Sequence, residues 1–207
     1  MGWWSERVLP GCVDRALSTG PVMALRDRTC RGLEGRVLEI GFGSGLNVGA
    51  YPPAVVSVDA VEPSARAWAL SERRRAGSAV PVARAGLDGQ ALAAPDASYD
   101  AVLSTFTLCT IPDAAAALAE VRRVLRPGGR LHLLEHGLAP DRRVSAWQRR
   151  CDGLQGLVAG GCHLTRDAPA LVEAAGLRVQ SLEQSYLPGP SVAKPWGFVS
   201  VATAVRS

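Results

Sequence analysis

Three glycines at alternate positions, Gly41, Gly43 and Gly45, follow a short apolar run in this sequence. Glycine permits positive φ angles and lets a ligand approach the backbone closely, and a helix that begins after such a turn offers free N–H groups to that ligand. A nicotinamide dinucleotide site would require its third glycine at position 46, where the sequence has Leu46. The turn therefore predicts a small-molecule site, and the mismatch disfavours a nicotinamide-dependent oxidoreductase.

Two carboxylates accompany this turn and indicate the chemistry of the ligand. Glu39 lies inside the first apolar run, two residues before Gly41, where a carboxylate would suit an amine-bearing, cationic ligand. Glu62 follows the second apolar run, 21 residues after Gly41. In doubly wound sheets that position meets a ribose diol, and a carboxylate accepts hydrogen bonds from two hydroxyls well.

The elements that must position these residues alternate between strands and helices. Short apolar runs predict strands over 36–40, 55–61, 79–85, 99–104, 131–134, 177–184 and 197–205. Helices are predicted over 64–76, 113–125, 142–157 and 167–175, with residues 1–32 as helical N-terminal decoration. This alternation predicts an α/β, Rossmann-like doubly wound fold. Its seven-stranded sheet is expected to be mostly parallel with an antiparallel edge strand, and to carry helices on both faces.

Composition narrows the class of protein. The chain has 207 residues, is 47% hydrophobic and carries a net charge of +4 without a long Lys/Arg run. We therefore expect a single globular domain, 1–207, with no nucleic-acid partner. Five cysteines without a CxxC pair disfavour a disulfide framework and fit a reducing, cytoplasmic location. No apolar stretch reaches the about 18 residues of a transmembrane helix, so we expect no integral membrane association, whereas peripheral contact stays open.

Further motifs follow the glycine turn in a fixed order. The pattern E-x-G-x-G-x-G starts at Glu39, and the next predicted strand ends at Glu62. Segments 88–92 and 95–100 then form a loop that leads into a strand, and segment 125–130 has the sequence LRPGGR. Over residues 33–136 this order resembles the class I S-adenosylmethionine (SAM) methyltransferases. The resemblance implies that the cofactor is SAM and that the chain is a methyltransferase.

The resemblance also implies which residues contact the cofactor. They are Glu39, Gly41, Gly43, Gly45, Asn47, Glu62, Pro63, Asp88, Gly89, Gln90, Thr105 and Phe106. The glycines and Thr105 would lie at the methionine end of SAM, and Glu39 would orient its amino group. Glu62 would hold both ribose hydroxyls, and Asp88 would meet the adenine amino group beside the backbone of the next two residues.

Segments 104–111, 135–136 and 160–167 narrow the resemblance to the methyltransferase-like seven (thiol methyltransferase) family and its bacterial relatives. This implies S-methylation of a small-molecule acceptor such as a thiol. The bacterial relatives are also similar to phospholipid N-methyltransferases, so an amine acceptor stays open, as does a non-catalytic SAM-binding role. Membrane-bound members of the family carry a hydrophobic N-terminal anchor; since residues 1–32 show no such apolar run, we do not expect this mode of membrane attachment.

Methyl transfer from a sulfonium is an in-line displacement, in which alignment supplies much of the rate, and a general base is useful but not required. His136 follows the fifth strand, at the edge where open sheets bind ligands, and could accept a proton near neutral pH. We predict His136 and His163 as catalytic residues. The structural alternative for His136 is that it caps the end of the strand, and for His163 that its hydrogen bond fixes the loop. Arg166 is interpreted as a loop ion pair, and Asp167 as a helix cap in competition with Thr165.

No metal ion is expected. His136, Cys162 and His163 are of ligand type, but Cys162 and His163 are adjacent, which is poor spacing for chelation. Cys109 is predicted to be a buried, inert thiol at the end of a strand. Residues 1–31 are expected to close over the cofactor as a lid that excludes water.

Overall fold

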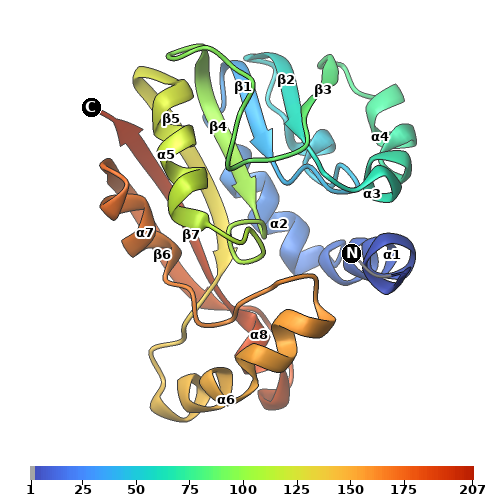
Figure 1. The fold of residues 1–207 in the computed structure, drawn as a ribbon, viewed down its shortest axis with the longest axis vertical. Coiled ribbons are helices and arrows are strands. Elements are labelled where there is room, and N and C mark those ends of the chain that lie inside the picture. The colour runs from blue at the N-terminus through green and yellow to red at the C-terminus, as the bar shows by residue number, and fades with distance from the viewer. Residues whose placement is uncertain (1–2) are drawn as a thin grey trace.

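A seven-stranded sheet in the order β3-β2-β1-β4-β5-β7-β6 runs through the protein (Figure 1). The structure is a computed structural model that describes residues 3–207. Its strands are β1 Gly35–Ile40, β2 Val55–Val61, β3 Val82–Gly86, β4 Tyr99–Thr105, β5 Leu125–His136, β6 Leu177–Tyr186 and β7 Phe198–Arg206. The first five strands pair in parallel, and β7 pairs antiparallel with both β5 and β6. The predicted doubly wound, mostly parallel sheet is confirmed.

Helices cover both faces of this sheet, as predicted. They are η1 Trp4–Val8, α1 Leu9–Leu17, α2 Gly20–Cys30, η2 Val48–Ala50, α3 Ala65–Leu70, α4 Glu72–Ala76, α5 Ala114–Val124, α6 Arg142–Val158, α7 Ala168–Ala174, η3 Ser191–Ala193 and α8 Lys194–Gly197. In Figure 1, α5 and α7 lie in front of the sheet and α2 lies behind it. The pair α6 and α8 lies beyond the carboxyl ends of the parallel strands.

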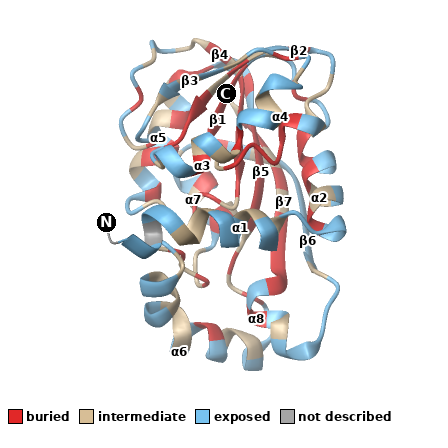
Figure 2. Cartoon of the chain, turned by 90° about the vertical axis from the view of Figure 1, so that its right-hand side faces the viewer, coloured by how far each residue is buried: buried red, intermediate tan, exposed pale blue. Residues whose placement is uncertain are grey.

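Buried residues concentrate in the strands, whereas the outer faces of the helices are exposed (Figure 2). Successive residues of β1 point to opposite faces, so Val37 packs into the core under α2 and Leu38 into the core under α5, which also holds Leu118 and Val121. Both faces of the sheet are therefore covered and shielded from solvent, which explains the nearly unbroken apolar runs of these strands.

Side-chain caps set the starts of three helices. Ser64 Oγ accepts from the Ala67 N–H, and the Asp113 carboxylate accepts from the Ala116 N–H. Asp167 caps α7 through the Ala170 N–H, so Asp167 rather than Thr165 is the cap. Such bonds satisfy N–H groups that lack an intrahelical partner.

Most element boundaries lie within three residues of the sequence-based expectation, and β3, for example, starts at Val82 instead of residue 79, but two elements differ more. The helix predicted over 64–76 is divided into α3 and α4 at Ser71, whose Oγ donates to the Trp68 carbonyl at 2.6 Å. A side-chain bond of this kind competes with the regular helical pattern. The fifth strand begins at Leu125, six residues before the predicted start, because the backbone of the Pro-Gly-Gly segment continues into it.

The N-terminal segment is mostly helical, as predicted, with a break at residues 18–19, while Met1 and Gly2 lie outside the described residues. Within residues 3–207, no helix is both long enough and apolar enough to cross a membrane.

Candidate functional site

The glycine turn after β1 packs against the loop that follows β4. Gly41, Gly43 and Gly45 all have positive φ, at 71°, 59° and 77°. A Cβ atom added to Gly41 would lie 2.0 Å from Thr107 Oγ1, so only glycine fits there. The surroundings of Gly43 are different, since an added Cβ would meet only the Gly41 carbonyl oxygen, at 3.9 Å. Gly43 therefore presents open space to a ligand.

Glu62, at the end of β2, is fixed beside this turn. Its side chain is buried, and its two oxygens accept from the Gly43 N–H at 2.6 Å and from the Ser64 N–H at 2.7 Å. Burial raises the pKa of Glu62 above its ordinary value, although these two bonds oppose the shift. The structure thus brings together Glu62 and the turn, which the sequence grouped only by order along the chain, while Pro63, the next residue, is exposed.

A buried polar network lies next to the turn. Asn47 Nδ2 donates to Glu39 Oε1 at 3.0 Å and to Thr105 Oγ1 at 2.9 Å. Arg26 Nη1 donates to Asn47 Oδ1 at 2.8 Å and to Thr105 Oγ1 at 2.7 Å, and Tyr51 donates its hydroxyl hydrogen to Glu39. Arg26 comes from α2 and was not predicted, because nothing local distinguishes one arginine of an N-terminal helix from the others.

The network holds opposite charges out of water. Burial raises the pKa of Glu39 to about 7, although the hydrogen bonds from Tyr51 and Asn47 and the charge of Arg26 oppose it. Burial likewise lowers the pKa of Arg26. Arg26 Nε has no hydrogen-bond partner among the described residues. An unsatisfied buried donor is costly, so this nitrogen is suited to an acceptor that a ligand brings.

The loop after β3 is held against the end of β1. Asp88 is exposed, and its Oδ1 accepts from the backbone and side-chain nitrogens of Gln90 at 2.8 and 2.9 Å, bonds that lower its pKa. Gly89 is buried, and a Cβ there would approach Ile40 Cγ2 to 2.8 Å. Gln90 Oε1 accepts from the Asp113 N–H at 2.8 Å, which ties the loop to the start of α5.

Phe106 connects this region with the predicted acceptor side. It is a non-glycine residue with a φ of 53°, a conformation that costs about 1–3 kcal/mol and often marks functional sites. Its ring centroid lies 5.4 Å from the guanidinium carbon of Arg26 and 6.2 Å from the ring centroid of His136.

His136 contacts two cysteines that come from other segments. Its Nε2 lies 3.1 Å from Cys162 Sγ, and ligand atoms of Cys109, His136 and Cys162 all lie within 4.8 Å of one another. The hydrogen bond from Cys109 lowers the pKa of the Cys162 thiol, and His136 lowers it further against the effect of burial. Burial lowers the pKa of His136, but Cys162 and Glu135 more than compensate and raise it overall. Cys109 is buried as predicted, but it is part of a cluster.

His163 does not join this cluster. Its Nδ1 lies 2.8 Å from Asp152 Oδ2 on α6, and Asp152 Oδ1 accepts from the Thr165 N–H at 3.1 Å. The contacts of His163 are thus those of a residue that fastens its loop to α6. The expectation of no metal ion rested on the pairing of Cys162 with His163, two side chains that the structure directs to different partners.

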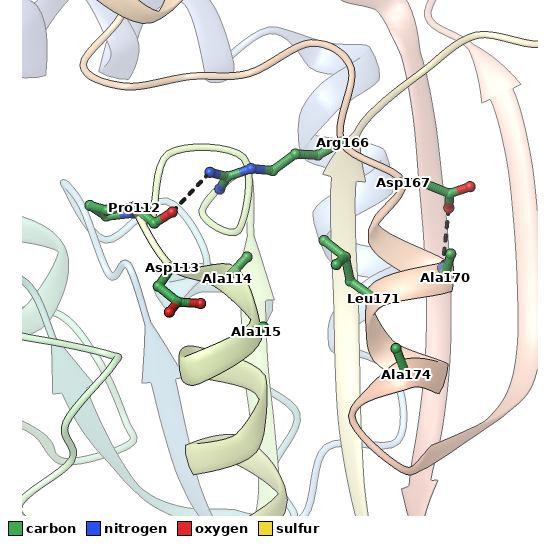
Figure 3. A pocket seen from close by; sticks show the side chains of 9 residues that line it. All are labelled: Pro112, Asp113, Ala114, Ala115, Arg166, Asp167, Ala170, Leu171 and Ala174. Atoms are coloured by element: carbon green, nitrogen blue, oxygen red, sulfur yellow. Dashed lines mark hydrogen bonds between the residues drawn. The ribbon is translucent and has the colours of Figure 1, made fainter.

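Arg166 crosses from the α7 segment to the loop after β4 (Figure 3). Its guanidinium donates to the carbonyls of Leu108, Ile111 and Pro112. These bonds replace the predicted loop ion pair, since Arg166 makes no ion pair with any residue of the described chain. The adjoining groove of about 720 Å³ lies between α5 and α7 and contains none of the predicted cofactor residues.

Comparison with known proteins decides the family. A model of the methyltransferase domain matches residues 38–133. The rat thiol S-methyltransferase TMT1B is 32% identical over 176 residues, which cover 82% of this chain and 70% of the relative. The chain belongs to the class I SAM-dependent methyltransferases. The human thiol S-methyltransferase TMT1A is 32% identical to this methyltransferase over 158 residues, 73% of the chain and 64% of the relative.

Solved structures show the same fold. A methyltransferase from Bacillus halodurans superposes on this methyltransferase with a TM-score of 0.72 at 14% identity, covering 90% of this chain and 99% of the other. A SAM-dependent methyltransferase from Thermotoga maritima gives a TM-score of 0.68 at 20% identity, with 99% of both chains covered.

Proposed function

We propose that this methyltransferase transfers the methyl group of SAM to the sulfur atom of a small thiol. The match to rat thiol S-methyltransferase TMT1B carries the proposal. Its 176 residues extend well beyond the segment 38–133 of the general domain model, so the similarity includes residues outside the cofactor half. The human and mouse TMT1B proteins are also similar, at 35% and 34% identity.

The residues present fit SAM. The open face of Gly43 and the partnerless Nε of buried Arg26 are features that a ligand would complete. Glu62 would hold the ribose hydroxyls and Asp88 the adenine amino group. Thr105, the glycine turn and Glu39 would hold the methionine end, with Arg26 on its carboxylate. When bound, SAM supplies a methyl group already activated by its positive sulfur.

The protein's own contribution is positioning and exclusion of water. Asp14 on α1 accepts from Ser44 Oγ at 2.6 Å and from Arg74 at 2.7 Å, and Trp4 Nε1 donates to the Val158 carbonyl at 2.9 Å. The N-terminal helices therefore bridge the glycine turn and α6, which supports their proposed role as a lid. Holding the acceptor in line with the methyl group then lowers the barrier mainly through alignment.

His136 is proposed to act on the acceptor side, where it lies between Phe106 and Cys162. His163 is proposed to be a positioning residue, because its partner is Asp152. A cytoplasmic location also stays a prediction.

The test is a transfer assay with methyl-labelled SAM and a panel of small thiols, amines, phenols and phosphatidylethanolamine vesicles. The expected product is a labelled thioether. Label on the amine or the lipid without label on any thiol would replace this proposal by N-methylation, an activity carried by a relative from Cereibacter sphaeroides that is 33% identical over 105 residues. Retention of SAM without transfer to any acceptor would indicate a non-catalytic SAM-binding protein.

A further inference from the structure

Cys109, His136 and Cys162 come from three separate segments and converge at the carboxyl edge of the sheet. Cys109 follows β4, His136 ends β5, and Cys162 lies in the loop between α6 and α7. Their sulfur and nitrogen atoms all lie within 4.8 Å of one another. Both cysteines are free thiols, and both are buried, at 3% and 6% exposure. We call these three residues the Cys2His cluster.

The spacing of the cluster is close to that of a zinc site. Zn–S bonds of about 2.3 Å and Zn–N bonds of about 2.0 Å place tetrahedral ligand atoms about 3.5–3.8 Å apart. His136 Nε2 and Cys162 Sγ are 3.1 Å apart, and no separation within the cluster exceeds 4.8 Å. Side-chain shifts of about 1 Å or less would therefore seat an ion. Three protein ligands with a fourth position open is the pattern of catalytic zinc sites.

The backbone holds the cluster in place. Gly160 and Gly161 have φ angles of 64° and 87°, and a Cβ on Gly161 would lie 3.0 Å from the Thr110 carbonyl oxygen. The His163 N–H donates to the Cys109 carbonyl at 2.9 Å, so the two cysteine-bearing loops are hydrogen-bonded to each other. Such a fixed donor set favours ion binding, because few degrees of freedom remain to be lost.

Neighbouring polar groups support the two cysteine ligands. Gln155 Nε2 lies 3.7 Å from Cys162 Sγ. Glu135 Oε1 accepts from the Thr107 and Leu108 N–H groups at 2.6 and 2.8 Å and thereby fixes the loop that leads to Cys109. Groups that orient metal ligands in this way tune the affinity of a site.

We propose that Cys109, His136 and Cys162 bind one Zn²⁺ ion, whose fourth coordination position takes the sulfur of the acceptor thiol. The role of the ion rests on the proposed thiol methylation. Thr105, proposed at the methionine end of SAM, is the last residue of β4, and Cys109 lies in the loop that follows it, so the ion would lie near the methyl donor.

Zinc would increase the ionised fraction of the acceptor thiol. A free thiol is only a few per cent ionised at pH 7, whereas a thiol that coordinates zinc is deprotonated outright. The acceptor thiol releases its proton to solvent on binding zinc. Its sulfur then attacks the methyl carbon of SAM, so that a new S–C bond forms while the bond from that carbon to the SAM sulfur breaks. The products are the methyl thioether and S-adenosylhomocysteine, and zinc is neither oxidised nor reduced.

The first experiment measures metal binding without activity. The full chain is loaded with zinc, passed through a desalting column and analysed by mass spectrometry for metal content, and a Co²⁺-loaded sample is examined for sulfur-to-cobalt charge-transfer absorption. We expect about one zinc per chain and a cobalt band. Cys162→Ser should lose both, whereas Cys151→Ser, a matched control on α6 outside the cluster, should keep both.

A zinc-free wild type, or a Cys162→Ser variant that binds zinc as tightly as the wild type, would overturn the site. The zinc content of the wild type alone decides whether the protein binds zinc, so this outcome does not depend on whether a variant folds. Circular dichroism and SAM titration show whether Cys162→Ser keeps its fold.

The second experiment tests the role of the ion. Removal of zinc with a chelator should lower thiol methylation at least tenfold while SAM affinity is kept, and zinc should restore turnover. Adding the thiol to the cobalt form should shift its absorption. Full activity without zinc would overturn the role and leave thiol methylation standing. If zinc is bound but no thiol is methylated and the cobalt absorption does not shift, the role of the ion and the proposed thiol methylation would both be overturned. The metal site itself would stand.

Discussion

Replacing Glu39 by glutamine is expected to remove a pH-dependent loss of stability. Glu39 lies in the network at the glycine turn, where burial raises its pKa from 4.5 to about 7. Glutamine keeps the shape of the side chain and an oxygen that can accept from Tyr51 or Asn47, but it carries no charge. The substitution therefore isolates the cost of ionising this one carboxyl inside the folded protein.

The sign follows from the raised pKa of the folded state. Between pH 4.5 and pH 7 the folded protein holds the Glu39 proton while the unfolded chain has released it, so wild-type stability falls as pH rises through this window. A shift from 4.5 to about 7 corresponds to about 3 kcal/mol at 1.36 kcal/mol per unit. Below pH 4.5 both states are protonated and this contribution is absent.

The assay is urea unfolding of SAM-free wild type and Glu39→Gln from pH 4.5 to pH 8. Relative to the wild type, the variant should gain about 3 kcal/mol of unfolding free energy over this range. Burial also raises the pKa of Glu62 and Glu135, so only the difference between the two proteins is diagnostic. Glu173→Gln, an exposed position on α7, is the matched control, and its difference from the wild type should stay constant. Parallel curves for wild type and Glu39→Gln would refute the argument.

Three further predictions concern the cofactor side. Gly41→Ala should lower the free energy of unfolding by about 2–5 kcal/mol, because its Cβ would clash with Thr107 at 2.0 Å. Gly43→Ala should lower it by only about 1 kcal/mol and should mainly reduce SAM affinity, measured by calorimetry. Equal losses of stability in the two variants would contradict this. Glu62→Ala should weaken SAM binding by about 1–3 kcal/mol, and normal binding would show that Glu62 does not hold the ribose. Asp14→Ala breaks a partly exposed ion pair with Arg74, so it should lower stability by at most about 1 kcal/mol while weakening SAM binding. Unchanged affinity would argue against the lid.

The layered fold could be predicted because its signals are local. Apolar runs such as 55–61, glycine stops and capping residues such as Asp113 act within a few residues of each other, and the structure keeps them nearly unchanged. The division of the helix at Ser71 and the early start of β5 could not be predicted, since both depend on competition between alternative backbone hydrogen bonds.

The candidate site was predictable to the extent that it lies on one motif. The glycine turn and Glu62 could be grouped because the order of strands in a doubly wound sheet brings these positions to one edge. Arg26 could not be grouped with them, because it reaches the network from α2, which precedes the motif and is not part of it. His163 was grouped with Cys162 because the two are adjacent, yet in this loop their side chains reach different partners, Asp152 and His136.

The sequence by itself determined the layered fold, the glycine turn and the two acidic residues beside it, because these depend on backbone freedom and on the periodicity of apolar residues. Only the tertiary structure decided which polar side chains meet. The Arg26–Asn47–Thr105 network and the cluster of Cys109, His136 and Cys162 each join segments far apart in the chain. Their partners are selected by helix packing and loop direction, which no local pattern of residues encodes.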